Sequence, residues 1–111
     1  MLIMTNAGVY TAVQHDTEPD RLTVYTYDLE SAQIAVDGLE MLHGEECPIT
    51  SRPGLHMFHV DREHFADWVA EEIRQYLTYP IFELALEDSR GEEWMLMHSH
   101  IKGALMDHIH E

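Results

Sequence analysis

The stretch from Asp61 to Leu77, DREHFADWVAEEIRQYL, is the most strongly periodic segment of the chain. Its apolar residues recur every three or four positions, so they form one stripe along a helix of 3.6 residues per turn. The stripe consists of Phe65, Trp68, Val69, Ile73, Tyr76 and Leu77. Asp61 is placed to cap the first turn, and Pro80 excludes helical geometry at the residue before it. We therefore predict an amphipathic helix over 61–77 that packs on a small sheet.

Three extended segments are predicted in the first quarter of the chain. Residues 2–5, 9–14 and 21–27 alternate in polarity or are rich in β-branched and aromatic side chains, which is typical of strands. Asn6-Ala7-Gly8 suits a tight turn between the first two, with Gly8 free to adopt positive φ. A single bent strand over 2–14 is the alternative.

A second helix is predicted over residues 29–43. Asp28 stands at its N-cap position, and Gly44 stands where a glycine commonly ends a helix. Gly38 argues against this helix, because an interior glycine costs about 1 kcal/mol relative to alanine.

The rest of the chain predicts a loop, a strand and a hairpin. Residues 45–54 contain two prolines and form the longest predicted loop, and residues 55–60 form a short strand. Residues 81–87 alternate in polarity and, with residues 93–100, indicate a β-hairpin. The segment 101–111 is either a short C-terminal helix or a frayed tail.

These elements follow the order β-β-β-α-β-α-β-β, which predicts an α+β fold. We expect a mostly antiparallel sheet of about five to six strands covered by two helices. The chain has 111 residues and no internal repeat or linker, so a single domain over 1–111 is expected.

Charge excludes several classes of partner. The chain has 21 Asp and Glu residues against 6 Lys and Arg, and a formal net charge of −15. Such a field repels nucleic acids and anionic lipid, and no apolar run is long enough to span a bilayer. A basic protein is the expected partner. The alternatives are that the acidity only maintains solubility or reflects a salt-rich cytoplasm.

Acidic residues form a row on the 61–77 helix. Glu63, Asp67 and Glu71 recur every four residues, about 6 Å apart, and Glu72 adds to them. This spacing resembles that of phosphates along a nucleic acid strand. The row predicts a surface that docks on a basic partner, as an inhibitor or a nucleic-acid mimic would. The alternative is an ordinary solvated helix face.

Histidines near the C-terminus suggest a divalent metal site. On a strand, His98 and His100 would point to the same face and could share one ion, with His108 or His110 adding a further nitrogen ligand. No other cofactor is expected. The alternative is that these histidines are solvated or satisfied in the core. A second group lies near the start of the 61–77 helix: His56, His59 and His64.

Catalysis finds little support in the sequence. Cys47 precedes Pro48 in an acidic loop, and nearby carboxylates raise the pKa of a thiol and weaken it as a nucleophile. No glycine-flanked serine elbow or glycine-rich phosphate loop is present. A single cysteine also excludes an internal disulfide and favours a cytoplasmic location.

We therefore predict a small, acidic, non-enzymatic binding or regulatory protein. A histidine-based metal-binding protein and an oligomerisation module are the alternatives. Self-association is favoured by the segment 93–100, because Trp94 and Leu96 alternate with Met95 and Met97. A strand that is apolar on both sides is covered on both or contributes to a partner surface.

Overall fold

The structure, a computed structural model, describes residues 1–76, 87 and 90–110, with only the backbone described for 76 and 108–110. The chain divides into two compact units, Met1–Arg74 and Gln75–Glu111, and each is described by itself. The expected single domain over 1–111 stays a prediction. Within the described ranges, no helix has the length and apolar character needed to cross a bilayer.

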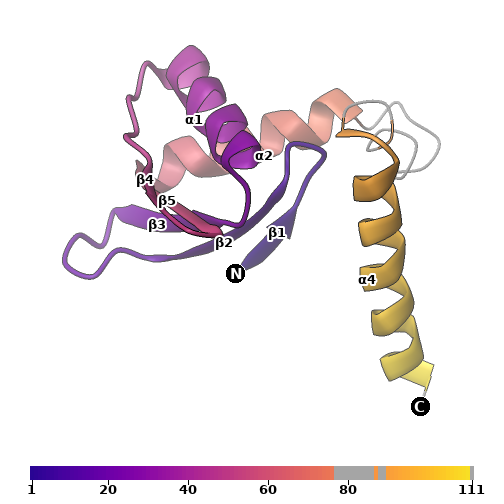
Figure 1. The fold of residues 1–111 in the computed structure, drawn as a ribbon. Helices are drawn as coiled ribbons and strands as arrows, with labels where there is room; N and C mark the ends of the chain where they lie inside the picture. Colours follow the sequence, from indigo (N-terminus) through magenta and orange to yellow (C-terminus); the bar gives the residue numbers. More distant parts are fainter. Residues whose placement is uncertain (77–86, 88–89, 111) are drawn as a thin grey trace. The chain divides into compact units, whose positions relative to one another are not determined.

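One antiparallel sheet of five strands forms the base of the first unit, so the predicted α+β class is confirmed (Figure 1). The strands lie in the order β1-β2-β3-β5-β4. Their bounds are β1 Leu2–Met4, β2 Val9–Gln14, β3 Arg21–Thr26, β4 Thr50–Arg52 and β5 Leu55–Asp61. Two helices, α1 Leu29–His43 and α2 Arg62–Tyr76, lie on the same side of this sheet (Figure 1).

The first two strands form a hairpin and not a single bent strand. Thr5 and Gly8 exchange two backbone hydrogen bonds of 2.9 and 3.2 Å, and the Thr5 hydroxyl accepts another from the Ala7 amide at 3.1 Å. Gly8 does not adopt positive φ. It is needed for space, because a Cβ there would lie 2.3 Å from the Ser31 hydroxyl oxygen.

Helix α1 has the predicted bounds, but its two ends differ in how they are capped. Gly44 adopts φ 68°, and its amide donates to the Glu40 carbonyl at 2.7 Å, as expected of a C-terminal glycine. Asp28 is extended, and its side chain makes no capping hydrogen bond. Its backbone carbonyl accepts from the Ala32 amide instead.

Helix α2 confirms the central prediction. The Asp61 carboxylate accepts hydrogen bonds from the Glu63 amide at 2.9 Å and the His64 amide at 3.1 Å, which satisfies two free donors of the first turn. These bonds, led by that from His64, hold the pKa of Asp61 below its usual value. Leu77 and Pro80 lie outside the described residues.

The core lies between the sheet and the two helices. Trp68 of α2 is 3% exposed and packs edge-on against Tyr10 of β2, with 5.4 Å between ring centroids. It also rests on Gly38 of α1, where a Cβ would lie 2.4 Å from the indole nitrogen. Gly38, which argued against the helix, thus allows α1 and α2 to pack closely.

The predicted strand over 93–100 is wrong. These residues belong to helix α4, Glu92–His110. The segment 92–100 contains no β-branched residue and is rich in Glu, Met and Leu, which are strong helix formers. Its proposed partner strand, 81–87, lies outside the described residues except Glu87, which is helical. The C-terminal helix is therefore much longer than the short one expected after residue 100.

The fifth strand comes from the predicted loop over 45–54. Strand β4 pairs antiparallel with β5, with Thr50 opposite Met57 and Arg52 opposite Leu55. Gly54 adopts φ 74° in the turn that joins them. Three residues between two prolines are too few for a recognisable strand pattern, so pairing with β5 defines β4.

Candidate binding site beside helix α2

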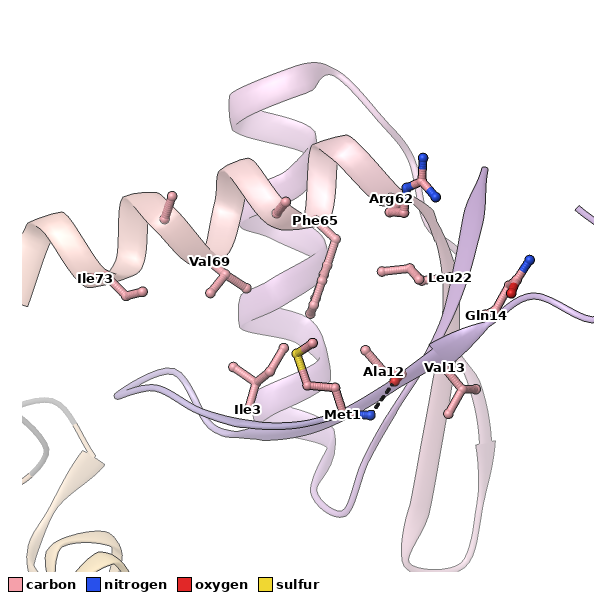
Figure 2. A pocket seen from close by; sticks show the side chains of 12 residues that line it. Met1, Ile3, Ala12, Val13, Gln14, Leu22, Arg62, Phe65, Val69 and Ile73 are labelled. Atoms are coloured by element: carbon pink, nitrogen blue, oxygen red, sulfur yellow. Dashed lines mark hydrogen bonds between the residues drawn. The ribbon is translucent and has the colours of Figure 1, made fainter. Parts of the chain in front are cut away.

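An apolar groove of about 460 Å³ lies between α2 and the sheet (Figure 2). Figure 2 shows Phe65 and Val69 pointing from α2 toward Met1 and Ile3 on the sheet side. The groove is lined by Met1, Ile3, Ala12, Val13, Gln14, Leu22, Arg62, Phe65, Ala66, Val69, Ala70 and Ile73. Only Gln14 and Arg62 carry polar side chains, so the interior attracts apolar groups.

The apolar stripe of α2 is wider than its contact with the core, and this width creates the groove. Phe65 is 2% exposed, whereas Val69 is half-buried and Ile73 is 52% exposed. The small side chains of Ala66 and Ala70 leave space beside them. The sequence predicted the stripe as buried, but the sheet covers only one side of it.

The predicted acidic row lies on the outer side of α2. The side chains of Glu63, Asp67 and Glu71 are 78%, 63% and 56% exposed. Each one pairs with a cation or a histidine of the same molecule: Arg62–Glu63 at 3.6 Å, His43–Asp67 at 3.2 Å and Arg74–Glu71 at 2.9 Å. The row is accessible, but its charge is partly neutralised within the chain.

Glu72 does not share this outer side. At 100° per residue, its direction from the helix axis falls between those of Phe65 and Trp68, which face the core. Its side chain is partly buried, and loss of hydration raises the pKa of the carboxyl above its usual value. Glu72 therefore belongs to the packed side of α2.

A chain of titratable side chains connects α1 to α2. The Glu45 carboxylate lies 2.7 Å from His64 Nδ1, and the His64 ring stacks on His43 at 4.0 Å. His43 Nε2 in turn lies 3.2 Å from the Asp67 carboxylate. Sequence reasoning missed this arrangement because two segments that are distant in the sequence, 43–45 and 64–67, supply its members, and no short motif joins them.

Two further contacts fix Glu45. Its carboxylate accepts from the Asp61 amide at 3.1 and 3.3 Å and lies 3.7 Å from the Arg21 guanidinium. Among the residues that the structure describes, no three His, Cys, Asp or Glu side chains are arranged to hold a metal ion. The contacts of His43 and His64 connect the C-terminal end of α1 to the first turns of α2.

The predicted metal site assumed that His98 and His100 lie on a strand, and the structure places them on a helix. His98 and His100 lie on α4, where residues two apart point about 200° from each other, so the assumption that they share a strand face is wrong. The side chains of His108 and His110 lie outside the description. The second histidine group is dispersed among different partners: His56 with Ser51, His59 with Thr23 and His64 with Glu45.

Cys47 is 3% exposed. Burial, and next the negative charge of Glu45, raises the pKa of its thiol to about 11. The acidic loop predicted the direction of this shift, but burial is the larger cause. A buried thiol that stays protonated at neutral pH does not act as a nucleophile.

The first unit thus belongs to the class of α+β proteins in which two helices cover one face of an antiparallel sheet. Its distinguishing feature is the open apolar groove beside the second helix. Comparison of the chain with protein-family models, curated proteins and solved structures finds no match.

Proposed function

We propose that the protein is a non-enzymatic binding protein that docks a basic, amphipathic helix of a partner protein beside α2. The observation that carries this proposal is the apolar groove, which lies next to the acidic row on the same helix. A helix laid in such a groove buries an apolar face and leaves its polar face at the rim.

The side chains on the surface of α2 support both parts of this interaction. Ala66 and Ala70 line the groove on the side of the acidic row, and Asp67 lies about 60° to 100° further round the helix axis. Apolar side chains of a partner helix would fill the groove, and its Lys or Arg side chains would lie over the acidic row. Opposite charges at the rim steer association and select the partner.

The internal ion pairs of the acidic row do not prevent Lys or Arg side chains of a partner from binding its carboxylates. Each carboxylate of the row is more than half exposed, and an exposed ion pair contributes only about 0–1 kcal/mol. A partner cation can therefore replace Arg62 or Arg74 at small cost. Nucleic-acid mimicry has less support, because a mimic presents unpaired negative charges in a regular line.

A peptide titration tests the role of the groove. The probe is a labelled helical peptide of about 18 residues with Leu at i, i+3, i+4 and i+7 and Lys elsewhere. Fluorescence anisotropy should show binding that weakens about tenfold or more with Ala70→Trp, which fills the groove. The matched control is Met41→Trp, at a 90% exposed position on α1, which should have no effect.

A second pair of variants tests the acidic row. The triple variant Glu63→Lys, Asp67→Lys and Glu71→Lys should abolish binding of the same peptide. The control makes an equal charge change at exposed positions elsewhere, with Asp16→Lys, Glu40→Lys and Glu46→Lys. Circular dichroism establishes that each variant is folded. Equal losses in both triple variants, or undiminished binding to Ala70→Trp, would mean that the peptide only senses net charge, and the proposal would be wrong.

A further inference from the structure

The middle carboxylate of the acidic row differs from the other two in the kind of side chain that it meets. Glu63 and Glu71 each pair with an arginine, and a guanidinium keeps its positive charge at any pH near neutrality. The Asp67 carboxylate instead lies 3.2 Å from His43 Nε2. An imidazole gains its positive charge as the pH falls from about 8 to 5, so the charge of Asp67 is balanced only at the acidic end of that range.

The chemistry of the two groups fixes where the protons lie. An ionised carboxylate only accepts hydrogen bonds, so the nearby Nε2 of His43 carries a hydrogen and donates it to Asp67. While the ring is neutral, Nδ1 holds no hydrogen and the carboxylate keeps its full negative charge. When Nδ1 takes up a proton, the ring becomes a cation and the pair becomes electrically neutral. One proton therefore decides whether the centre of the row has an unbalanced negative charge.

The structure holds the His43 ring behind Asp67. The ring of His64 stacks on it, with 4.0 Å between centroids and 10° between the ring planes. The His43 side chain is 23% exposed, whereas that of Asp67 is 63% exposed. A Lys or Arg side chain of a partner can therefore reach Asp67 from solvent, and His43 competes with it from the protein side.

The other charged groups around the two rings have partners of their own. The Glu45 carboxylate is 13% exposed, lies 2.7 Å from His64 Nδ1 and 3.7 Å from the Arg21 guanidinium, and accepts from a backbone amide. A positive charge on His64 would repel one on His43, and Glu45 offsets this repulsion at close range. In the adjoining turns of the chain, besides the acidic row and its arginines, the remaining titratable side chains are the exposed Glu40 and Glu46, the protonated thiol of Cys47 and the Asp61 carboxylate, which caps α2.

Building on the docking function proposed above, we propose that His43 regulates partner binding by competing for Asp67 as the pH falls. At neutral pH the uncharged ring leaves the negative charge of Asp67 to a Lys or Arg of the partner. At acidic pH the imidazolium neutralises the same carboxylate and repels the incoming cation. The partner therefore binds at neutral pH and is released on acidification.

The pH dependence of peptide binding tests this competition. The basic helical peptide described above is titrated at about pH 7.5 and about pH 5.5 in about 0.15 M NaCl, since its lysines stay charged at both values. The affinity at the higher pH divided by that at the lower should be about twofold to fivefold smaller in His43→Gln than in the wild type, because glutamine donates a hydrogen bond but gains no charge. The control, His56→Gln, removes a histidine that bonds to Ser51 and should keep the wild-type ratio.

A permanent charge at the same position tests the opposite direction. His43→Arg should weaken binding at about pH 7.5 by about twofold to fivefold, because a guanidinium does not release its proton. Circular dichroism at both pH values establishes that each variant is folded. Equal ratios in the wild type and His43→Gln, or full affinity in His43→Arg, would overturn the competition while leaving peptide binding in place. A wild type that does not bind the peptide at about pH 7.5 would instead contradict the proposed function, and the competition with it.

Discussion

The position of a carboxylate around the helix axis determines its chemistry more than its neighbours in sequence do, and Glu72 is an example. Glu71 and Glu72 are adjacent, yet Glu71 is exposed and pairs with Arg74, whereas Glu72 is partly buried. One step of 100° along a helix separates a solvated carboxylate from one that loses hydration. Burial raises the pKa of Glu72, so its ionised form is less stable in the folded protein than in the unfolded chain.

Glu72→Gln should therefore stabilise the protein at neutral pH. The ionised carboxylate destabilises the fold, and this penalty appears as pH rises above 4.5 and is complete above the raised pKa. Because the side chain keeps part of its hydration, the gain in unfolding free energy at pH 7 should be below about 1 kcal/mol. It should disappear near pH 3.5, where both states are protonated.

Urea unfolding at the two pH values measures this effect, with Glu40→Gln as the control at an exposed position of α1. The control removes one negative charge without relieving burial. If Glu72→Gln stabilised no more than Glu40→Gln at pH 7, the assignment of Glu72 to the packed side of α2 would be refuted.

At the scale of elements, the contact between α1 and α2 depends on one glycine. A Cβ on Gly38 would lie 2.4 Å from the Trp68 indole nitrogen, whereas a Cβ on Gly103 of α4 would meet none of the described residues within 4 Å. Both glycines lie inside helices, and within the described part of the chain only Gly38 has a neighbour that a Cβ would clash with.

Alanine at these two glycines should therefore have opposite effects. Gly38→Ala should destabilise the first unit by about 1–3 kcal/mol, because overpacking outweighs the helix propensity gained. Gly103→Ala has open space and should raise helix stability by up to about 1 kcal/mol. Thermal and urea unfolding followed by far-ultraviolet circular dichroism measure both changes. A stabilised Gly38→Ala would show that Trp68 can move away without loss.

At the scale of the whole molecule, negative charge opposes folding. Six Lys and Arg residues cannot balance 21 Asp and Glu residues, so the compact state concentrates repulsion that the unfolded chain relieves. The ion pairs Arg74–Glu71 and Arg62–Glu63 are exposed and contribute little. Screening should thus remove more repulsion than attraction.

The melting temperature should accordingly rise as NaCl is increased from about 0.05 to 1 M, over which the Debye length shortens to about 3 Å. Differential scanning calorimetry measures the change, and KCl at the same ionic strength should give an equal effect. A melting temperature that falls with salt would mean that the ion pairs stabilise the fold more than the net charge destabilises it.

Local signals in the sequence were sufficient for the two helices of the first unit. The apolar period and the Asp61 cap predicted the start of α2 to within one residue, and Gly44 marked the end of α1. They were insufficient for α4, where apolar residues at successive positions match strand and helix alike. They were also insufficient for β4, whose three residues are a strand because β5 lies beside them.

The sequence by itself determined the α+β class, the α2 helix and the acidic row, because caps, periodicity and charge act over a few neighbouring residues. Only the tertiary structure decided which part of each apolar surface is covered. The sheet buries Phe65 but leaves Ile73 in the groove, and α1 accepts Trp68 because Gly38 makes room. It also decided that His43 meets Asp67, since packing brings together side chains that are distant in sequence.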